Sequence, residues 1–424
     1  MTLLVLGLLP AALLLMGVPI FAVLMVATLG GIMLGPNPVQ AIHSAMFGSL
    51  DIFPLLAVPL FIFAGDVMAR GGLARRLIQL ILAVVGGVRG SLGMATIAST
   101  EVFGVMSGSS VACVAAIGKL TIPSLRKNGY GNEFPVSLVT ASGVISVIIP
   151  PSIPMIIYGI AAQQSVPLLF LAGFVPGILI GGALAIYVYF YARVKNIPIA
   201  EKPEAETVRQ MSRGSIWAIL APVVILGGIY GGLFTPTEAA GVACIYAIAV
   251  SMFIYREISW RDLWEISIDS AALSAQVLII VSAAGAFGWL ITTSGYPTQL
   301  VSFVAGLHLE TWMLLLVINV ILLFVGSILE PPAAILLLTP LLTPIVYAAG
   351  VDPLHFGIIV TVNLAIGLFM PPFGLNLFAA NGLFGTPLPT LYRGMLPFLA
   401  VYLVMLVLIT YIPAITLLPV ALMK

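Results

Sequence analysis

Oxygen-bearing residues and prolines interrupt an otherwise apolar sequence at four places. Residues 107–110 read Ser-Gly-Ser-Ser, and residues 326–332 contain Gly-Ser followed by Glu-Pro-Pro. Two double prolines, Pro150-Pro151 and Pro371-Pro372, each end an apolar stretch that resumes at once. Proline removes a backbone donor and disfavours helix at the residue before it, so both stretches are predicted to break there. Carbonyl groups freed inside a membrane need protein, water or an ion, and with the hydroxyls they suit a hard monovalent cation.

Other chemistries fit these residues less well. Lys119 follows a glycine as in a phosphate loop, but no Ser or Thr follows it, so no ATPase is predicted. An intramembrane serine hydrolase using Ser107 stays open as an alternative from a different class, and it needs a base such as histidine. The three histidines, His43, His308 and His355, are expected at membrane-surface positions. We therefore expect a protein that is not an enzyme.

Composition defines the class of protein. Hydrophobic residues make up 61% of the 424 residues and charged residues only 7%, against roughly 25% in a soluble domain. Long apolar runs predict an all-α polytopic membrane protein embedded in the lipid bilayer, because a barrel would show short alternating strands. The net charge of +1 gives no reason to expect a nucleic-acid partner.

The two double prolines belong to an internal repeat. They are 221 residues apart (371 − 150 = 221), and the same shift also aligns Pro176 with Pro397. The sequence thus predicts a first repeat at 1–195, a linker at 196–213 and a second repeat at 214–424. The basic residues of the linker place it on the cytoplasmic side. Repeats of this kind predict two halves of one fold with opposite membrane orientation, each with a re-entrant helical hairpin and a broken helix.

The interruptions also have a structural explanation, namely kinked helices whose small residues allow close packing. Their pairing at one offset favours a binding site near the middle of the membrane. Charges near the predicted tips and loops are candidates for function or for structural ion pairs: Glu101, Lys119, Glu238 and Glu330. Asp66 and Arg70, four residues apart, are expected to pair on one helix face.

Five motifs resemble one known family over essentially the whole chain. They are AGDVMARGGL at 64–73, SGSSVA at 107–112, IIPPSIPM at 148–155, GLFTPTEAA at 232–240 and MPPFGLN at 370–376. Together they resemble the large membrane subunit, of the DctM type, of the tripartite ATP-independent periplasmic (TRAP) transporters.

The resemblance implies a secondary importer in the bacterial inner membrane, coupled to Na⁺ and working as an elevator. It also implies two partners, a small four-helix membrane subunit and a soluble periplasmic substrate-binding protein. One implied Na⁺ site comprises Ser107, Ser110, Ser146, Ile149 and Pro151, several of them through carbonyl groups. The second comprises Gly326, Gly367, Met370 and Phe373. Ser146 departs from the glycine of the family pattern, which leaves the backbone freedom of the first site in question.

The expected substrate is a small organic anion, such as a C4-dicarboxylate or a sialic or other sugar acid. Ser152 and Asn376 follow the two breaks, and their side chains are predicted to bind it by hydrogen bonds. A partner-independent ion-coupled anion carrier stays open as the alternative within the same class.

Overall fold

The computed structural model describes residues 9–34, 38–85, 87–199 and 205–423, and every regular element in these ranges is a helix. Seven helices are long and apolar enough to cross a membrane. Val208–Gly214 and Ile216–Tyr230 form a further span if this pair, bent by 55°, is counted as one. The predicted linker at 196–213 includes residues 200–204, which lie outside the described ranges, and it is helical from Ala205.

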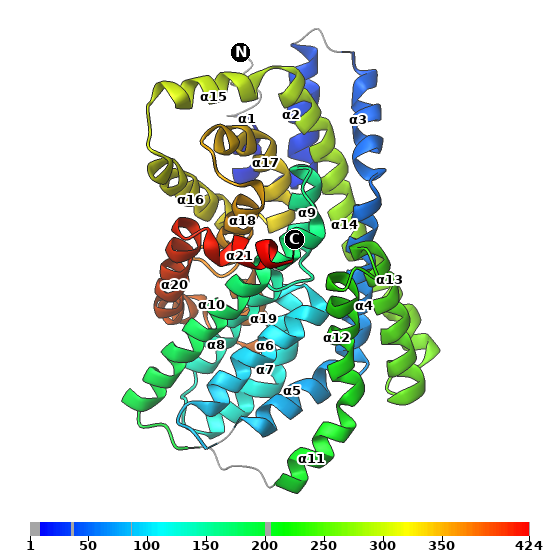
Figure 1. Cartoon of the computed structure of the whole chain (residues 1–424), viewed down its shortest axis with the longest axis vertical. Coiled ribbons are helices and arrows are strands. Elements are labelled where there is room, and N and C mark those ends of the chain that lie inside the picture. The colour runs from blue at the N-terminus through cyan, green and yellow to red at the C-terminus, as the bar shows by residue number, and fades with distance from the viewer. Residues whose placement is uncertain (1–8, 35–37, 86, 200–204, 424) are drawn as a thin grey trace.

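Within its described residues, the first half contains ten α-helices and two short 3₁₀ segments, and Figure 1 shows their arrangement. They are α1 (Leu9–Leu15), α2 (Ile20–Met33), α3 (Gln40–Leu50), η2 (Phe53–Leu56), α4 (Ala57–Arg70), α5 (Leu73–Val84), α6 (Ser91–Ser107), α7 (Ser110–Lys127), α8 (Phe134–Ser142), η3 (Gly143–Val147), α9 (Ile153–Ala161) and α10 (Val166–Val194).

The second half repeats the order of the first from α5 onward. Its elements are α11 (Ala205–Gly214), α12 (Ile216–Tyr230), α13 (Pro236–Ile248), the π-helix η4 (Ala249–Ile254), α14 (Trp260–Thr293), α15 (Tyr296–Gly306), α16 (Thr311–Ile328), α17 (Pro331–Ala348), α18 (Pro353–Gly367), α19 (Leu375–Phe384), α20 (Leu388–Tyr411) and α21 (Ala414–Leu422). Equivalent helices start between 353 − 134 = 219 and 296 − 73 = 223 residues apart, for α8 with α18 and α5 with α15. The relative direction of the halves stays a prediction.

Capping boxes fix where helices α13 and α14 begin. Thr235 and Glu238 form a capping box at the start of α13, and Ser259 and Asp262 form another at the start of α14. In each box the hydroxyl accepts from the N3 backbone N–H while the carboxylate accepts from the N-cap N–H, which satisfies two otherwise free donors. The exposed Glu238 is therefore explained by helix capping. Helix α14 then runs beside α2, α3 and α4 (Figure 1).

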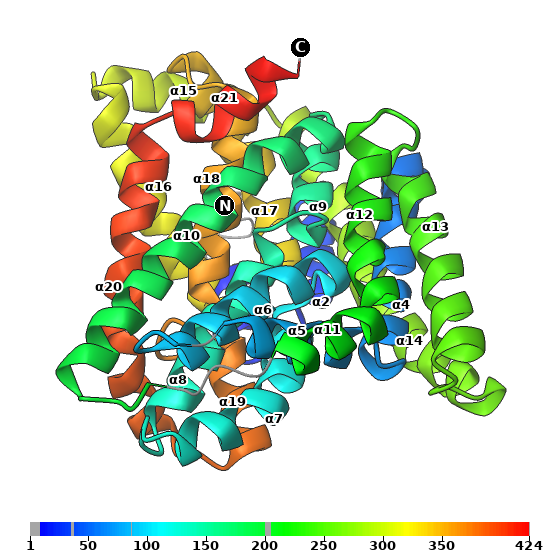
Figure 2. The ribbon, with the colours of Figure 1, turned by 60° about the horizontal axis from the view of Figure 1, so that its bottom comes forward.

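The two halves are packed into each other. Helix α9 of the first half packs on α17 of the second, and α19 of the second half packs on α7 of the first. The long helices α10 and α20 lie side by side (Figure 2). An aromatic cluster joins them to α8: the rings of Phe134 and Tyr191 stack 3.7 Å apart, and the ring of Phe398 lies 5.1 Å from that of Tyr187. One continuous hydrophobic core therefore includes residues of both halves.

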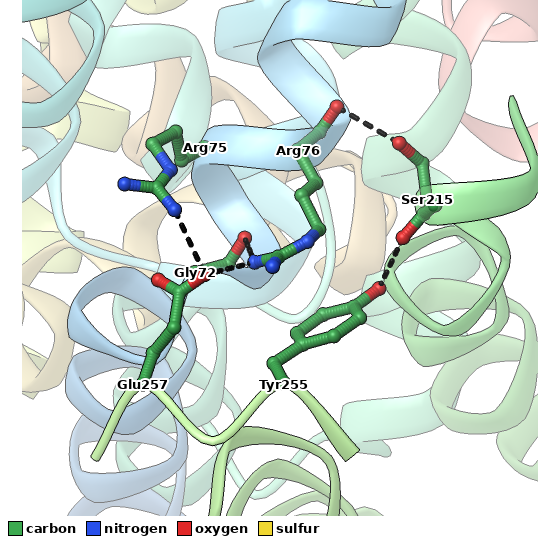
Figure 3. A network of polar contacts seen from close by, with 7 residues as sticks. Gly72, Arg75, Arg76, Ser215, Tyr255 and Glu257 are labelled. Atoms are coloured by element: carbon green, nitrogen blue, oxygen red, sulfur yellow. Dashed lines mark hydrogen bonds and ion pairs between the residues drawn. The ribbon is translucent and has the colours of Figure 1, made fainter. Parts of the chain in front are cut away.

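Helix α5 is fixed to the other half by a polar network (Figure 3). Glu257, between α13 and α14, pairs with Arg75 at 2.8 Å and also with Arg76. The Arg76 guanidinium stacks 3.8 Å from the centre of the Tyr255 ring. The backbone carbonyl of Arg76 accepts a hydrogen bond from the Ser215 hydroxyl at 3.1 Å. Helix α15, at the equivalent place in the second repeat, has no buried residue.

Candidate functional site

The first tip is a helix end followed at once by a helix start. Helix α6 ends at Ser107, and Gly108 takes the left-handed conformation (φ 56°) in which helices commonly terminate. Ser109 is the N-cap of α7, and its hydroxyl accepts a hydrogen bond from the Ala112 N–H at 3.4 Å. The predicted interruption at residues 107–110 is thus present, and it leaves Ser110 as the first residue of α7.

The first break contains more than the double proline. Helix α8 tightens into the 3₁₀ segment η3 before Pro150-Pro151, and α9 starts two residues later. The Ser146 hydroxyl donates to the Gly143 carbonyl at 2.7 Å. The Ser152 hydroxyl donates to the Val147 carbonyl and accepts from the N–H of Met155 at 3.4 Å, so it caps α9. Hydroxyl groups of the break itself therefore satisfy part of its backbone.

Glycines bring the first tip against the first break. A Cβ atom at Gly104 would lie 2.7 Å from the Cα of Ser146, and one at Gly108 would lie 3.2 Å from the Pro151 carbonyl oxygen. A Cβ atom at Gly143 would lie 3.4 Å from the carbonyl oxygen of Ser110. The backbones of tip and break are in direct contact, as the predicted cation site requires.

The second tip, where α16 ends and α17 begins, and the second break, the segment 368–374 between α18 and α19, meet more closely. A Cβ atom at Gly367, the last residue of α18, would overlap the carbonyl group of Gly326 in α16. The break then closes on itself, because the Leu368 carbonyl accepts from the Asn376 N–H at 2.8 Å and the Met370 carbonyl from the Gly374 N–H at 3.0 Å. This approach requires glycine at position 367, and a Cβ atom at Gly326 would be in tight contact with Leu364, at 3.0 Å from its side chain.

A cavity of about 1200 Å³ lies between the two tips. Both tips line it, together with α19, one face of α14 and the start of α2. Of the residues predicted for the ion sites, four line the cavity: Ser107, Ser110, Gly326 and Phe373. The other five lie outside its lining: Ser146, Ile149, Pro151, Gly367 and Met370. The wall supplied by α14, including Gln276, was not predicted, since nothing in its local sequence places it opposite the tips.

The two residues predicted to bind substrate are fully buried beside the cavity and do not line it. Ser152 is engaged with Val147 and Met155, as described above. The Asn376 amide nitrogen donates to the Ser110 hydroxyl oxygen at 2.6 Å and lies 3.3 Å from the Thr140 carbonyl oxygen. Both side chains are thus committed to the protein in this structure.

The charged residues that line the cavity are both acidic. They are Asp66 and Glu330, and the residues described as lining it include neither lysine nor arginine. Asp66 accepts a hydrogen bond from Ser270 at 2.6 Å. The predicted pair of Asp66 with Arg70 is wrong, because Arg70 pairs with Asp269 of α14 at 2.6 Å. Asp66 was thus missed as a residue of the cavity lining, although a carboxylate in an apolar helix is a signal that could have marked it.

The geometry around Ser107 gives no support to a hydrolase. The contacts of its hydroxyl are with the backbone of Ser109, at 3.4 and 3.5 Å. His355 is buried inside the protein, and its ring nitrogens contact Thr416 at 2.8 Å and the Thr410 carbonyl at 3.1 Å. Its position is explained by these polar partners, which the sequence around it did not reveal.

Two helix tips that meet two broken helices around one cavity define a membrane transport protein rather than an enzyme. Residues 7–415 match the family described as the tripartite ATP-independent periplasmic transporter, DctM component. The chain belongs to this family, and it is a multi-pass protein of the bacterial inner membrane. The resemblance seen in the motifs is thereby confirmed.

Three relatives and one solved structure illustrate the likeness. The chain is 42% identical over 407 residues to the isethionate TRAP transporter permease protein DctMQ of Oleidesulfovibrio alaskensis, covering 96% of this chain and 64% of that protein. It is 40% identical over 386 residues to the C4-dicarboxylate TRAP transporter large permease protein DctM of Pseudomonas aeruginosa, covering 91% of this chain and 90% of that protein. With the sialic acid TRAP transporter large permease protein SiaM of Vibrio cholerae it shares 35% identity over 403 residues, 95% and 94% of the two chains. The structure of the YdaH transporter of Alcanivorax borkumensis matches with a TM-score of 0.66 at 17% identity over 89% of each chain, and this shows the fold alone.

Proposed function

We propose that this chain is the large permease subunit of a Na⁺-coupled importer of a small organic anion. The observation that carries the proposal is the contact of each tip with its break at the edge of one cavity. At both contacts two separate segments meet at backbone level: the Pro151 carbonyl oxygen lies beside Gly108, and the Gly326 carbonyl oxygen lies beside Gly367. Converging oxygens at interrupted helices are the arrangement by which secondary transporters bind Na⁺ inside the membrane.

The first ion site is assigned to the contact of Ser107 and Ser110 with the first break. Ser146, Ile149 and Pro151 would contribute carbonyl oxygens from behind the cavity. The second site is assigned to the Gly326–Gly367 contact, with Met370 and Phe373 beside it. The donor sets contain only oxygen groups without formal charge, which fits a weakly bound monovalent cation that has to be released.

Substrate binding is assigned to the cavity between the tips. The described residues of its lining include two carboxylates and no lysine or arginine. Groups other than basic side chains therefore have to balance the negative charge of the substrate. Bound Na⁺, the N–H groups at the start of α7 and the positive dipole end of α17 supply positive potential there, although the first two residues of α17 are prolines without an N–H. The named relatives transport carboxylates or a sulfonate, and the substrate of this chain is placed in that class. Ser152 and Asn376 would act on it from behind the lining.

Transport is assigned to an elevator movement of the tips and broken helices against α2, α3, α4 and the α12–α14 side. Delivery by a periplasmic binding protein and pairing with a small membrane subunit follow from the tripartite family. In each proposed hairpin the two helices would enter and leave the membrane on the same side. Their tip would then lie near the middle of the membrane, where the two tips can meet. Movement of this assembly as one body would carry both ions with the substrate.

Reconstitution into liposomes tests the proposal. Uptake of radiolabelled C4-dicarboxylates, sialic acid and isethionate is measured with an inward Na⁺ gradient and with a choline gradient of equal strength. We expect uptake only with Na⁺, the small subunit and the cognate binding protein. Equal uptake in choline would refute Na⁺ coupling. Full uptake by this chain alone would instead identify a partner-independent carrier.

A further inference from the structure

Asn376 connects the second break to the first tip. Its backbone N–H donates to the Leu368 carbonyl at 2.8 Å, next to Gly367 and the second ion site. Its side-chain nitrogen donates to the Ser110 hydroxyl oxygen at 2.6 Å, in the first tip. Asn376 thus connects the second break to Ser110 of the first tip, which lies 266 positions earlier in the sequence.

The orientation of the Asn376 amide follows from its second partner. A backbone carbonyl only accepts hydrogen bonds, so the amide nitrogen and not the oxygen must face the Thr140 carbonyl at 3.3 Å. The same nitrogen then reaches Ser110. The Asn376 side-chain oxygen is buried and has no hydrogen-bond partner among the described residues. A buried polar atom without a partner is costly, so this arrangement is expected to serve more than packing.

Ser110 stands between Asn376 and the cavity. It lines the cavity, whereas Asn376 does not. The Ser110 hydroxyl oxygen has two lone pairs, and Asn376 occupies one of them. The other remains for a cation, and the hydrogen bond from Asn376 fixes the direction in which it points. Asn376 is therefore a positioning residue that acts through Ser110.

The first repeat has no polar counterpart of this link. The shift of 222 residues that relates the start of α19 to that of α9 places Pro154 at the position of Asn376 (376 − 222 = 154). At the position of Ser110, the start of α17 has Pro331. Neither proline side chain donates or accepts a hydrogen bond. The link between the second break and the first tip therefore has no symmetry-related counterpart between the first break and the second tip.

We propose that Asn376 couples the two ion sites, so that closing of the second break prepares Ser110 for the cation of the first site. The proposal rests on the proposed Na⁺ coupling. Ordering of the second break by its own ion fixes Leu368 and, through it, the Asn376 backbone and side chain. Binding at one site thus raises affinity at the other, and this coupling is reciprocal.

Na⁺ binding by the purified chain, together with its small membrane partner, tests the coupling without measuring transport. The chain is titrated with NaCl at constant ionic strength in choline chloride, and ²²Na⁺ binding and the thermal unfolding midpoint are recorded. Wild type is expected to bind with a Hill coefficient above 1. Asn376→Leu keeps the size but removes the donor, and it is expected to lower Na⁺ affinity about tenfold and the Hill coefficient to about 1.

A double-mutant cycle shows whether Asn376 acts through Ser110. We expect Ser110→Ala to weaken binding and Asn376→Leu to add little to it, because both remove the same oriented oxygen. Asn319→Leu is the matched control: Asn319 is a buried asparagine of the same repeat whose partners are Thr410 and Asn363. It should leave the Hill coefficient unchanged. Asn376→Ala replaces the leucine variant if that variant does not fold.

The outcomes separate this inference from the function beneath it. A wild-type protein that Na⁺ neither binds nor stabilises relative to choline would overturn both. Wild-type cooperativity retained in folded Asn376→Leu, or independent effects of the two substitutions in the cycle, would overturn the coupling and leave the proposed function standing.

Discussion

The two breaks differ in how the hydrogen bonds of their backbone carbonyl groups are satisfied. At the first break, side chains satisfy carbonyl groups: Ser146 and Ser152 from the break itself, and Tyr402 of α20, whose hydroxyl donates to Ala141 at 2.8 Å. At the second break, the turn closes mainly through backbone N–H groups, at Leu368 and Met370. The first break thus depends on side chains, two of its own and one from α20, whereas the second depends mainly on backbone hydrogen bonds.

The difference extends to the contact between tip and break. Ser146 and Gly367 hold equivalent positions (367 − 146 = 221), and each packs against a glycine of its tip, Gly104 or Gly326. The first contact accommodates the serine side chain, while the second leaves no room for a Cβ atom. Serine at the first position is therefore compatible with the contact, and its hydroxyl bonds the Gly143 carbonyl at 2.7 Å. We expect the second break to tolerate the fewest substitutions.

The largest effect is expected for Gly367→Ala. The added Cβ atom would overlap the Gly326 carbonyl, and relief of such overpacking costs about 1–3 kcal/mol or more. Na⁺-dependent uptake should fall at least tenfold, and the thermal unfolding midpoint should drop. The matched variant Ser146→Gly only removes a side chain and should keep most of the uptake. Equal loss in both variants would contradict the difference between the two breaks.

A smaller effect is expected for Ser152→Ala. The variant removes the N-cap of α9 and the hydrogen bond to the Val147 carbonyl, and loss of such a cap costs about 1 kcal/mol. Thermal unfolding in detergent should report this loss, and uptake should decrease with it. Ser165, at the start of α10, makes no side-chain cap hydrogen bond, so Ser165→Ala is the control. A Ser152→Ala variant as stable as that control would show that the cap is not needed.

The smallest effects are expected when single donors to the breaks are removed. Tyr402→Phe deletes the buried hydrogen bond to the Ala141 carbonyl and should cost about 1 kcal/mol. Tyr392→Phe deletes an exposed hydrogen bond to the Pro372 carbonyl at the second break, where the other hydrogen bonds are made by the backbone, and should cost less. Differential scanning fluorimetry shows which of the two substitutions lowers the thermal unfolding midpoint more. The reverse order would mean that the second break relies on side chains after all.

Local residue patterns were sufficient to predict where the helices are interrupted. They were not sufficient to predict which distant residues contact the interrupted segments. The double prolines and the Ser-Gly-Ser-Ser run predict where helices stop, because proline and glycine act on their own backbone. Asp66 and Arg70 have the spacing of a helical pair, yet Asp269, about 200 residues away, takes the arginine. The partner of Asn376 is equally remote. Contacts between α-helices distant in sequence depend on packing that no local pattern encodes.

The interlocking of α9 with α17 and of α7 with α19 has a consequence for biosynthesis. The hydroxyl that bonds Ala141 belongs to a residue 261 positions later in the chain. At a synthesis rate of about 5–20 residues per second, the ribosome needs roughly 13–50 s to supply it. During that interval the first break is already made but lacks its donors from the second half. The nascent first half is therefore expected to wait in the membrane as an incompletely packed intermediate, open to quality-control proteases until translation ends.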